Sequence, residues 1–126
     1  MIDHVSVAVS DLSRATAFYD RALGPLGYTR MITLPAAAGY GKRYPEFWLN
    51  LREGMAPVPP GSGAHVCLRA ADEGAVRAFH DAAETAGGDS DGAPGLRRAA
   101  LTTYFGAFIR DPDGNRVEAL TFPPAP

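Results

Sequence analysis

Two histidines and one glutamate are the residues of this sequence whose types and spacing suggest chemistry. His4 and His65 each belong to the first strand-like run of one half of the chain. Glu118 lies in the apolar run 117–120, where a carboxylate is unusual. Two imidazoles and one carboxylate form a facial triad that binds a divalent metal and leaves coordination positions open. These nitrogen and oxygen ligands suit Fe²⁺, Mn²⁺, Ni²⁺, Co²⁺ or Zn²⁺, so the sequence predicts a divalent-metal site.

The spacing of the two histidines is part of an internal repeat. Identical residues recur at the same offset along both halves: His4/His65, Val5/Val66, Asp11/Asp72, Ala17/Ala78, Phe18/Phe79, Asp20/Asp81, Ala22/Ala83 and Gly27/Gly88. Such self-similarity indicates repeated structural units. We therefore expect one domain made of two modules, about 1–53 and 64–122, joined by the proline- and glycine-rich linker 54–63.

The first module is expected to run strand, helix and three strands. In the strand 2–9, valines alternate with His4, Ser6 and Ala8, so the valine face suits packing against a helix and the other face suits a cavity wall. Asp11 is a good N-cap for an apolar-periodic helix that ends at the glycines of 24–27. Strands are expected at 28–34, after 36–41 and at 45–51.

The second module repeats this plan. The strand 64–70 is expected to carry His65 and Cys67 on one face, and Asp72 caps the helix that follows. Residues 89–98 are interpreted as a loop with at most a short strand, and the tail 123–126 as frayed. Strands 104–110 and 115–122 flank the turn 111–114, which is interpreted as a connector only. The fold class is therefore α+β: two βαβββ modules forming a curved, barrel-like mixed sheet with helices outside and the three candidate ligands on the concave side.

Bulk composition excludes several classes of protein. The chain has 126 residues, a net charge of −2 and scattered basic residues, so no nucleic-acid partner is expected. No apolar run is long enough for a membrane span, and no signal peptide is recognisable. The single cysteine excludes an internal disulfide and fits a reducing compartment. The prediction from composition is a soluble cytoplasmic protein.

The sequence resembles the vicinal oxygen chelate superfamily, which includes glyoxalase I, extradiol dioxygenases, and fosfomycin- and bleomycin-resistance proteins. The matching segments are 2–5, 11–12, 18–19, 23–28, 65–66, 79–80, 87–88, and above all Tyr104 and Phe108 before 111–118. The similarity is greatest to small bacterial glyoxalase-like proteins. It implies the superfamily fold, His4, His65 and Glu118 as metal ligands, and a homodimer.

One position departs from the glyoxalase I pattern. Glyoxalase I uses a fourth protein ligand, a glutamate, where this chain has Trp48, with Glu46 and Asn50 nearby. Losing that carboxylate removes a ligand and a proton shuttle for hemithioacetal isomerisation. The expected function is therefore a metal-dependent enzyme acting on a small organic substrate that chelates the metal through adjacent oxygens. Its chemistry is expected to be dioxygenase-like or transferase/lyase-like rather than that of glyoxalase I.

The remaining candidates have weaker signals. Tyr104 is the candidate acid–base residue beside the catalytic Glu118, with a core tyrosine as the alternative, and His80 is interpreted as lying on an outer helix face. The substrate cavity is expected to be lined by Ser6, Trp48, Asn50, Cys67 and Phe108. Arg69, Arg97 and Arg98 are interpreted as solvated surface residues, with contact to an anionic substrate group as the alternative. The competing function is a metal-free small-molecule binding protein of the bleomycin-resistance type.

Overall fold

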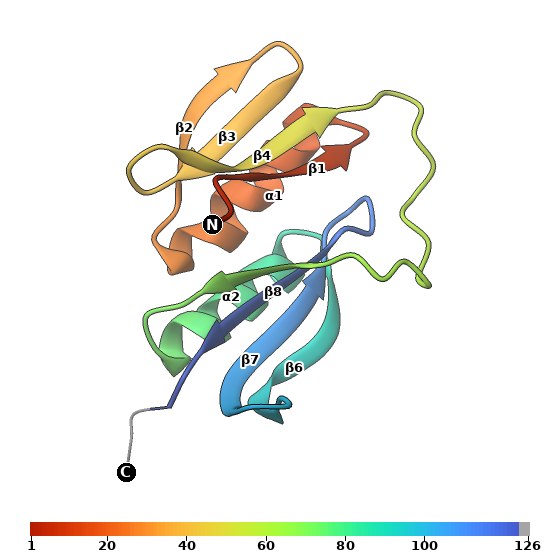
Figure 1. Ribbon diagram of the computed structural model, residues 1–126. Coiled ribbons are helices and arrows are strands. Elements are labelled where there is room, and N and C mark those ends of the chain that lie inside the picture. The colour runs from red at the N-terminus through yellow and green to blue at the C-terminus, as the bar shows by residue number, and fades with distance from the viewer. Residues whose placement is uncertain (124–126) are drawn as a thin grey trace.

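The chain forms two mixed four-stranded sheets that follow one another in sequence. The computed structural model describes residues 1–123 and shows the two sheets one above the other (Figure 1); the tail residues 124–126, for which fraying was expected, lie outside the described residues. The elements are β1 (Val5–Val9), α1 (Leu12–Leu23), η1 (Gly24–Leu26), β2 (Thr29–Leu34), β3 (Ala37–Gly41), β4 (Pro45–Leu51), β5 (Val66–Arg69), α2 (Glu73–Thr85), β6 (Asp89–Arg98), β7 (Thr103–Arg110) and β8 (Arg116–Thr121).

The two sheets have the same topology. Their strand orders are β1-β4-β3-β2 and β5-β8-β7-β6, with β1 parallel to β4, β5 parallel to β8, and the other pairs antiparallel. The parallel pairs require a crossover, which in each module includes the helix. The predicted α+β class and the two βαβββ units are confirmed.

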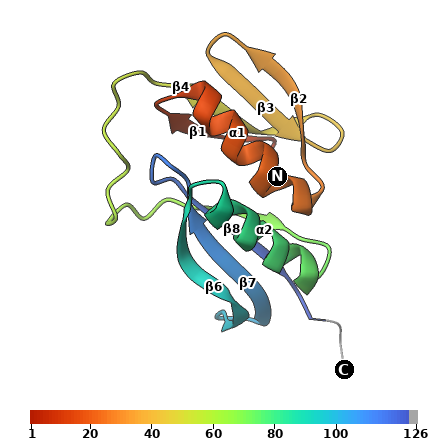
Figure 2. The same cartoon turned by 180° about the vertical axis from the view of Figure 1, so that it is seen from behind.

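Both helices lie on the same side of the two sheets, as the view from behind shows (Figure 2). Asp11 accepts a hydrogen bond from the Arg14 amide (2.9 Å) and Asp72 from the Ala75 amide (2.8 Å), so both predicted N-caps are formed. Apolar side chains of the helices and of the facing strand residues make the core. None of the helices within residues 1–123 is long and apolar enough to cross a membrane.

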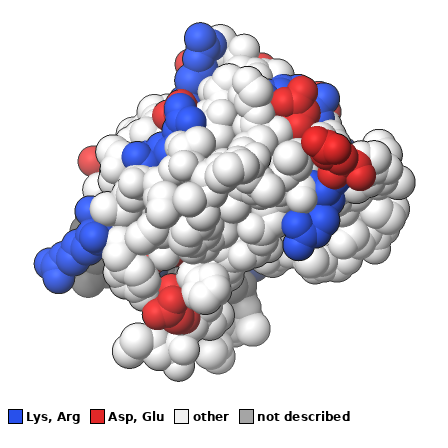
Figure 3. Space-filling view, turned by 90° about the horizontal axis from the view of Figure 1, so that it is seen from above, with Lys and Arg blue, Asp and Glu red and all other residues white. Residues whose placement is uncertain are grey.

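The opposite side of the two sheets, here called the open face, carries no helix within residues 1–123. Side chains alternate between the two sides: Phe47 and Leu49 are fully buried against the helices, while Trp48 between them is only half-buried on the open face. The sheets are curved but do not close into a barrel within one chain. The surface seen from above is mostly uncharged, with both basic and acidic side chains scattered over it (Figure 3).

Residues 89–98 form a strand, which the sequence-based interpretation as a loop missed. β6 pairs with β7 from Asp89 to Arg98, with irregularities around Gly92 and Gly95. Glycines weaken the strand signal and accompany bulges, which explains the wrong interpretation.

The turn at 111–114 is also more than a connector, because it binds the first module. The Asp113 carboxylate accepts hydrogen bonds from the Ser10 amide (3.1 Å) and the Ser10 hydroxyl (2.6 Å). The Asp111 carboxylate accepts one from the Tyr19 hydroxyl (2.6 Å), and the Asn115 amide donates to the Ala8 carbonyl (2.8 Å). This hairpin, residues 111–115, is therefore a polar connection between the modules.

Alkaline pH is expected to destabilise the protein through its buried tyrosines. Burial, and then the neighbouring Asp111, raises the pKa of Tyr19 well above its ordinary value; burial, and then Asp20, raises that of Tyr40. Each neutral phenol contributes its full stability below about pH 10, where an unfolded tyrosine ionises, and above that pH the unfolding free energy falls by about 1.4 kcal/mol per pH unit and tyrosine. Urea unfolding on either side of about pH 10 measures this slope. It should be smaller in Tyr19→Phe, and an equal slope in both proteins would contradict this assignment.

Candidate metal centre

Glu118 is a buried carboxylate on the open face of the second sheet. Its neighbours on β8, Val117 and Ala119, pack toward the helices, so Glu118 projects the other way, yet its exposed fraction is only 4%. Glu118 Oε1 lies 3.1 Å from His65 Nε2. Glu118 Oε2 is buried and has no hydrogen-bond partner within residues 1–123. A buried carboxylate oxygen without a partner is costly, so the site is suited to a cation that both residues can bind.

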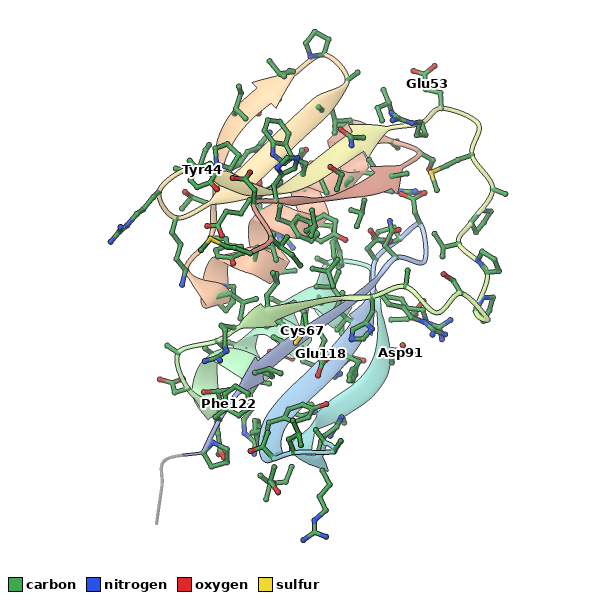
Figure 4. The ribbon with its side chains drawn as sticks, viewed as in Figure 1. Tyr44, Glu53, Cys67, Asp91, Glu118 and Phe122 are labelled. Carbon is green, nitrogen blue, oxygen red and sulfur yellow. The ribbon has the colours of Figure 1, made fainter. Side chains whose placement is uncertain are left out.

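A small cavity adjoins this pair. Its volume is about 140 Å³, and it is lined by His65, Asp91, Phe108, Arg116, Val117 and Glu118. The ring of His65 stands edge-on to that of Phe108, with centroids 6.1 Å apart. Figure 4 shows Cys67, Glu118 and Asp91 on the open face of the second sheet. The wall is thus part aromatic and part charged, as a site for a small polar organic molecule would be.

The Glu118 carboxylate contributes to raised pKa values of two neighbouring side chains, Cys67 and Tyr104. Cys67 stands opposite Glu118 in the β5–β8 register, and burial, followed by the charge of Glu118, raises the pKa of its thiol to about 12. The thiol of this exposed residue therefore stays protonated at neutral pH and is a poor nucleophile. Burial, and then the neighbouring Glu118 carboxylate, raises the pKa of Tyr104, so its phenol is a weaker acid than that of an ordinary tyrosine.

His4 lies apart from the Glu118–His65 pair. Its Nδ1 is 2.7 Å from Asp3 Oδ1, and the Tyr44 hydroxyl donates to Asp3 Oδ2 (2.7 Å). The Tyr44 hydrogen bond, followed by that of His4, lowers the pKa of Asp3. An imidazole whose Nδ1 is held by a carboxylate presents Nε2 to a metal. The Asp-His dipeptide at 3–4 carried this signal in the sequence, although Asp3 was not singled out.

One chain therefore assembles two of the three predicted ligands. His4 and His65 line a common groove of about 390 Å³ between the modules, but within residues 1–123 no three His, Cys, Asp or Glu side chains are placed to hold one metal ion. The donor types and the unpartnered Oε2 of Glu118 fit a divalent cation at the His65–Glu118 pair. In the same chain, His4 is not placed to bind an ion at this pair together with His65 and Glu118.

The predicted cavity residues fall on two separate surfaces. Ser6 pairs in register with Trp48, so both lie on the open face of the first sheet, and Asn50 lies one pleat further along β4. Gly39 leaves room for the indole, since a Cβ at that position would come within 3.2 Å of Trp48. Cys67 and Phe108 lie on the open face of the second sheet instead. These five residues do not surround one cavity in a single chain.

His80 is not on an outer helix face, contrary to expectation. Its exposed fraction is 8%, and its Nε2 lies 2.7 Å from the Ser90 hydroxyl oxygen. β6, which the sequence did not reveal, covers this side of α2 and supplies Ser90. His80 is thus a buried structural residue, away from the candidate metal centre.

The paired βαβββ modules, with a histidine–glutamate pair on the open face of the second, define a glyoxalase-like architecture. The family model for the glyoxalase/bleomycin resistance protein/dioxygenase superfamily matches residues 1–119. The chain belongs to this superfamily.

Solved structures show the same fold. A glyoxalase/bleomycin resistance protein from Albidiferax ferrireducens T118 is 33% identical with a TM-score of 0.81, and the match covers 94% of this chain and 96% of that one. A glyoxalase/bleomycin resistance protein/dioxygenase family enzyme from Burkholderia phytofirmans PsJN is 16% identical with a TM-score of 0.70, covering 97% and 98%. The V278E mutant of glyoxalase I from Zea mays is 23% identical with a TM-score of 0.69, covering 93% of this chain and 44% of that one. No curated protein sequence matches.

Proposed function

We propose that this protein is a divalent-metal-dependent enzyme whose small organic substrate binds the metal through adjacent oxygens. The observation that carries this proposal is the Glu118 carboxylate, which is 4% exposed, lies 3.1 Å from His65 Nε2 and has one oxygen without a partner within residues 1–123. Structural carboxylates in sheets are normally exposed or fully hydrogen-bonded. A metal ion would bind the unpartnered oxygen of Glu118 and would also have His65 as a ligand.

The third ligand in this proposal is His4 from a second copy of the chain. Within residues 1–123 no helix covers the open face of either sheet, and the two faces point to the same side (Figure 4). Side-chain alternation places Trp48 of β4 on one face and Glu118 of β8 on the other. A second copy packed on this side would bring the open face of its first sheet over Glu118. The same arrangement would unite the two groups of cavity residues, so we propose a homodimer with composite sites.

The residues of this chain favour dioxygenase-like or transferase/lyase-like chemistry. A bound divalent ion would supply Lewis-acid stabilisation of negative charge on substrate oxygens. Tyr104 is the proposed acid–base residue beside Glu118, while the protonated thiol of Cys67 is a poor nucleophile. Trp48 in place of a carboxylate argues against hemithioacetal isomerisation of the glyoxalase I type.

Elemental analysis of protein purified without a metal-affinity tag tests this proposal. The unchanged chain is expected to hold a divalent metal in stoichiometric amount, and His65→Ala and His4→Ala are expected to lose it. Glu46→Gln is the matched control, since Glu46 lines the groove between the modules but is no proposed ligand. Absence of metal after soaking the unchanged chain with each candidate ion would refute a metal-dependent enzyme.

A metal-free binding protein of the bleomycin-resistance type is the second candidate. It is favoured by the half-buried Trp48 on an uncovered face and by the incomplete ligand set of one chain within residues 1–123. Trp48 is the only tryptophan, so its fluorescence reports on a ligand bound to the first sheet. Aromatic ligand binding that is unchanged by chelators and by His65→Ala would support this function over the enzyme.

A further inference from the structure

Arg97 lies half-buried on the open face of the second sheet. It pairs in register with Tyr104, and its guanidinium carbon lies 5.3 Å from the centroid of the Phe108 ring. Its Nη1 donates to the Gly95 carbonyl (3.3 Å) and its Nη2 to the Ala93 carbonyl (2.6 Å). The side chain is thus folded back along β6 and held over Phe108.

Glycines in β6 make this position possible. A Cβ at Gly92 would stand 3.0 Å from Arg97 Nη2, and one at Gly95 would stand 3.4 Å from Nη1. The same glycines hid β6 from the sequence-based interpretation. Because Gly92 and Gly95 have no side chains, the flat guanidinium can lie close to the backbone of β6.

Arg97 has no acidic partner within residues 1–123. The nearby Asp91 faces Arg110 (3.6 Å) and Arg116 (3.5 Å), and Glu118 faces His65. An arginine side chain has five N–H donors, and two hydrogen bonds to carbonyls leave roughly three of them unused. A fixed planar guanidinium with free donors is well suited to bind a carboxylate in bidentate fashion.

His65, Phe108 and Arg97 form a row on the open face. In the strand order β5-β8-β7-β6, Phe108 on β7 comes between His65, just before β5, and Arg97 on β6. The Phe108 ring lies 6.1 Å from the His65 ring and 5.3 Å from the Arg97 guanidinium. We propose that the substrate is an organic acid: its adjacent oxygens lie at the His65–Glu118 end, its flat apolar body lies against Phe108, and its carboxylate binds Arg97. This inference rests on the proposed metal-dependent function and specifies its substrate class.

Two probes that differ by one carboxylate test the inference. Catechol and 3,4-dihydroxybenzoate share the ring and the adjacent oxygens, and calorimetry on the metal-loaded protein gives their dissociation constants. We expect 3,4-dihydroxybenzoate to bind about 10- to 100-fold more tightly, which is typical of a hydrogen bond to a charged group. Arg97→Gln should abolish this preference and leave catechol binding unchanged.

Arg98→Gln is the matched control. Arg98 is the next residue of the same strand, pairs with Thr103, is exposed, and carries the same charge. It should retain the full preference. Equal affinities for the two probes, or equal losses in Arg97→Gln and Arg98→Gln, would overturn the assignment of Arg97. Metal content measured on the same samples separates this failure from that of the proposed function, because a chain that takes up no metal overturns both.

Discussion

Glu118→Gln is expected to weaken divalent-metal binding strongly while making the metal-free protein more stable. The amide keeps the size of the side chain but removes a negative charge that is 95% shielded from solvent and has one unpartnered oxygen within residues 1–123. Relief of that burial should raise the unfolding free energy by about 1–2 kcal/mol. Loss of an anionic ligand should weaken divalent-metal affinity by about 100-fold or more. Urea unfolding in chelator and metal titration measure the two effects.

The opposite signs of these effects distinguish a functional carboxylate from a structural one. A glutamate that holds the sheet together would lose stability on substitution, because its hydrogen-bond partners would be left unpaired. Glu46→Gln, on the groove between the modules, should change neither quantity. A Glu118→Gln protein that is less stable in chelator and binds metal as before would show that Glu118 is structural.

Asp111→Ala is expected to cause the largest loss of stability, about 3 kcal/mol or more. The Asp111 side chain is buried and accepts hydrogen bonds from the Tyr19 hydroxyl (2.6 Å), the Asn115 side-chain amide (2.9 Å) and the backbone amides of Asp113 (2.9 Å) and Asn115 (2.8 Å). Removing the carboxylate leaves all four donors without this acceptor. Chemical denaturation followed by Trp48 fluorescence, which reports on the first module, measures the loss.

A comparison of the two modules during unfolding sharpens this test. In the unchanged chain, Trp48 fluorescence and circular dichroism should give one coincident transition, since the 111–115 hairpin bonds the modules together. Asp89→Ala, at the exposed start of β6, should cost less than about 0.5 kcal/mol. A comparably small loss in Asp111→Ala would mean that the hairpin contributes little to joining the modules.

The sequence was sufficient for those features that depend on local patterns. Apolar periodicity and the caps Asp11 and Asp72 located both helices, and the internal repeat located the second module from the first. Alternation within 116–121 placed Glu118 opposite to the core-facing side of β8. Its convergence with His65 was expected from the paired βαβββ arrangement. Each of these features is predicted from residues close together in the sequence, or from the repetition of such a pattern in the second module.

Other features depend on contacts that local patterns do not encode. β1 begins at Val5, so His4 precedes the strand and its direction is set by Asp3 and Tyr44 rather than by strand alternation. The glycines of β6 concealed a strand, and with it the burial of His80 and the position of Arg97. Whether the ligands meet within one chain depends on how whole modules pack, which the repeat does not specify.

The 111–115 hairpin also has a consequence for the order in which the chain is made. Asp113 bonds to Ser10 across 103 positions of sequence, and Asn115 bonds to Ala8 across 107. During translation, the first module is synthesised long before Asp113 and Asn115. Until then, the Ala8 carbonyl and the Ser10 amide are hydrogen-bonded to water. At about 5–20 residues per second, this interval lasts for about 5–20 seconds. The hydrogen bonds that join the modules therefore form only after residues 111–115 have been synthesised. In a chain halted before residue 111, the Ala8 carbonyl and the Ser10 amide would remain hydrogen-bonded to water.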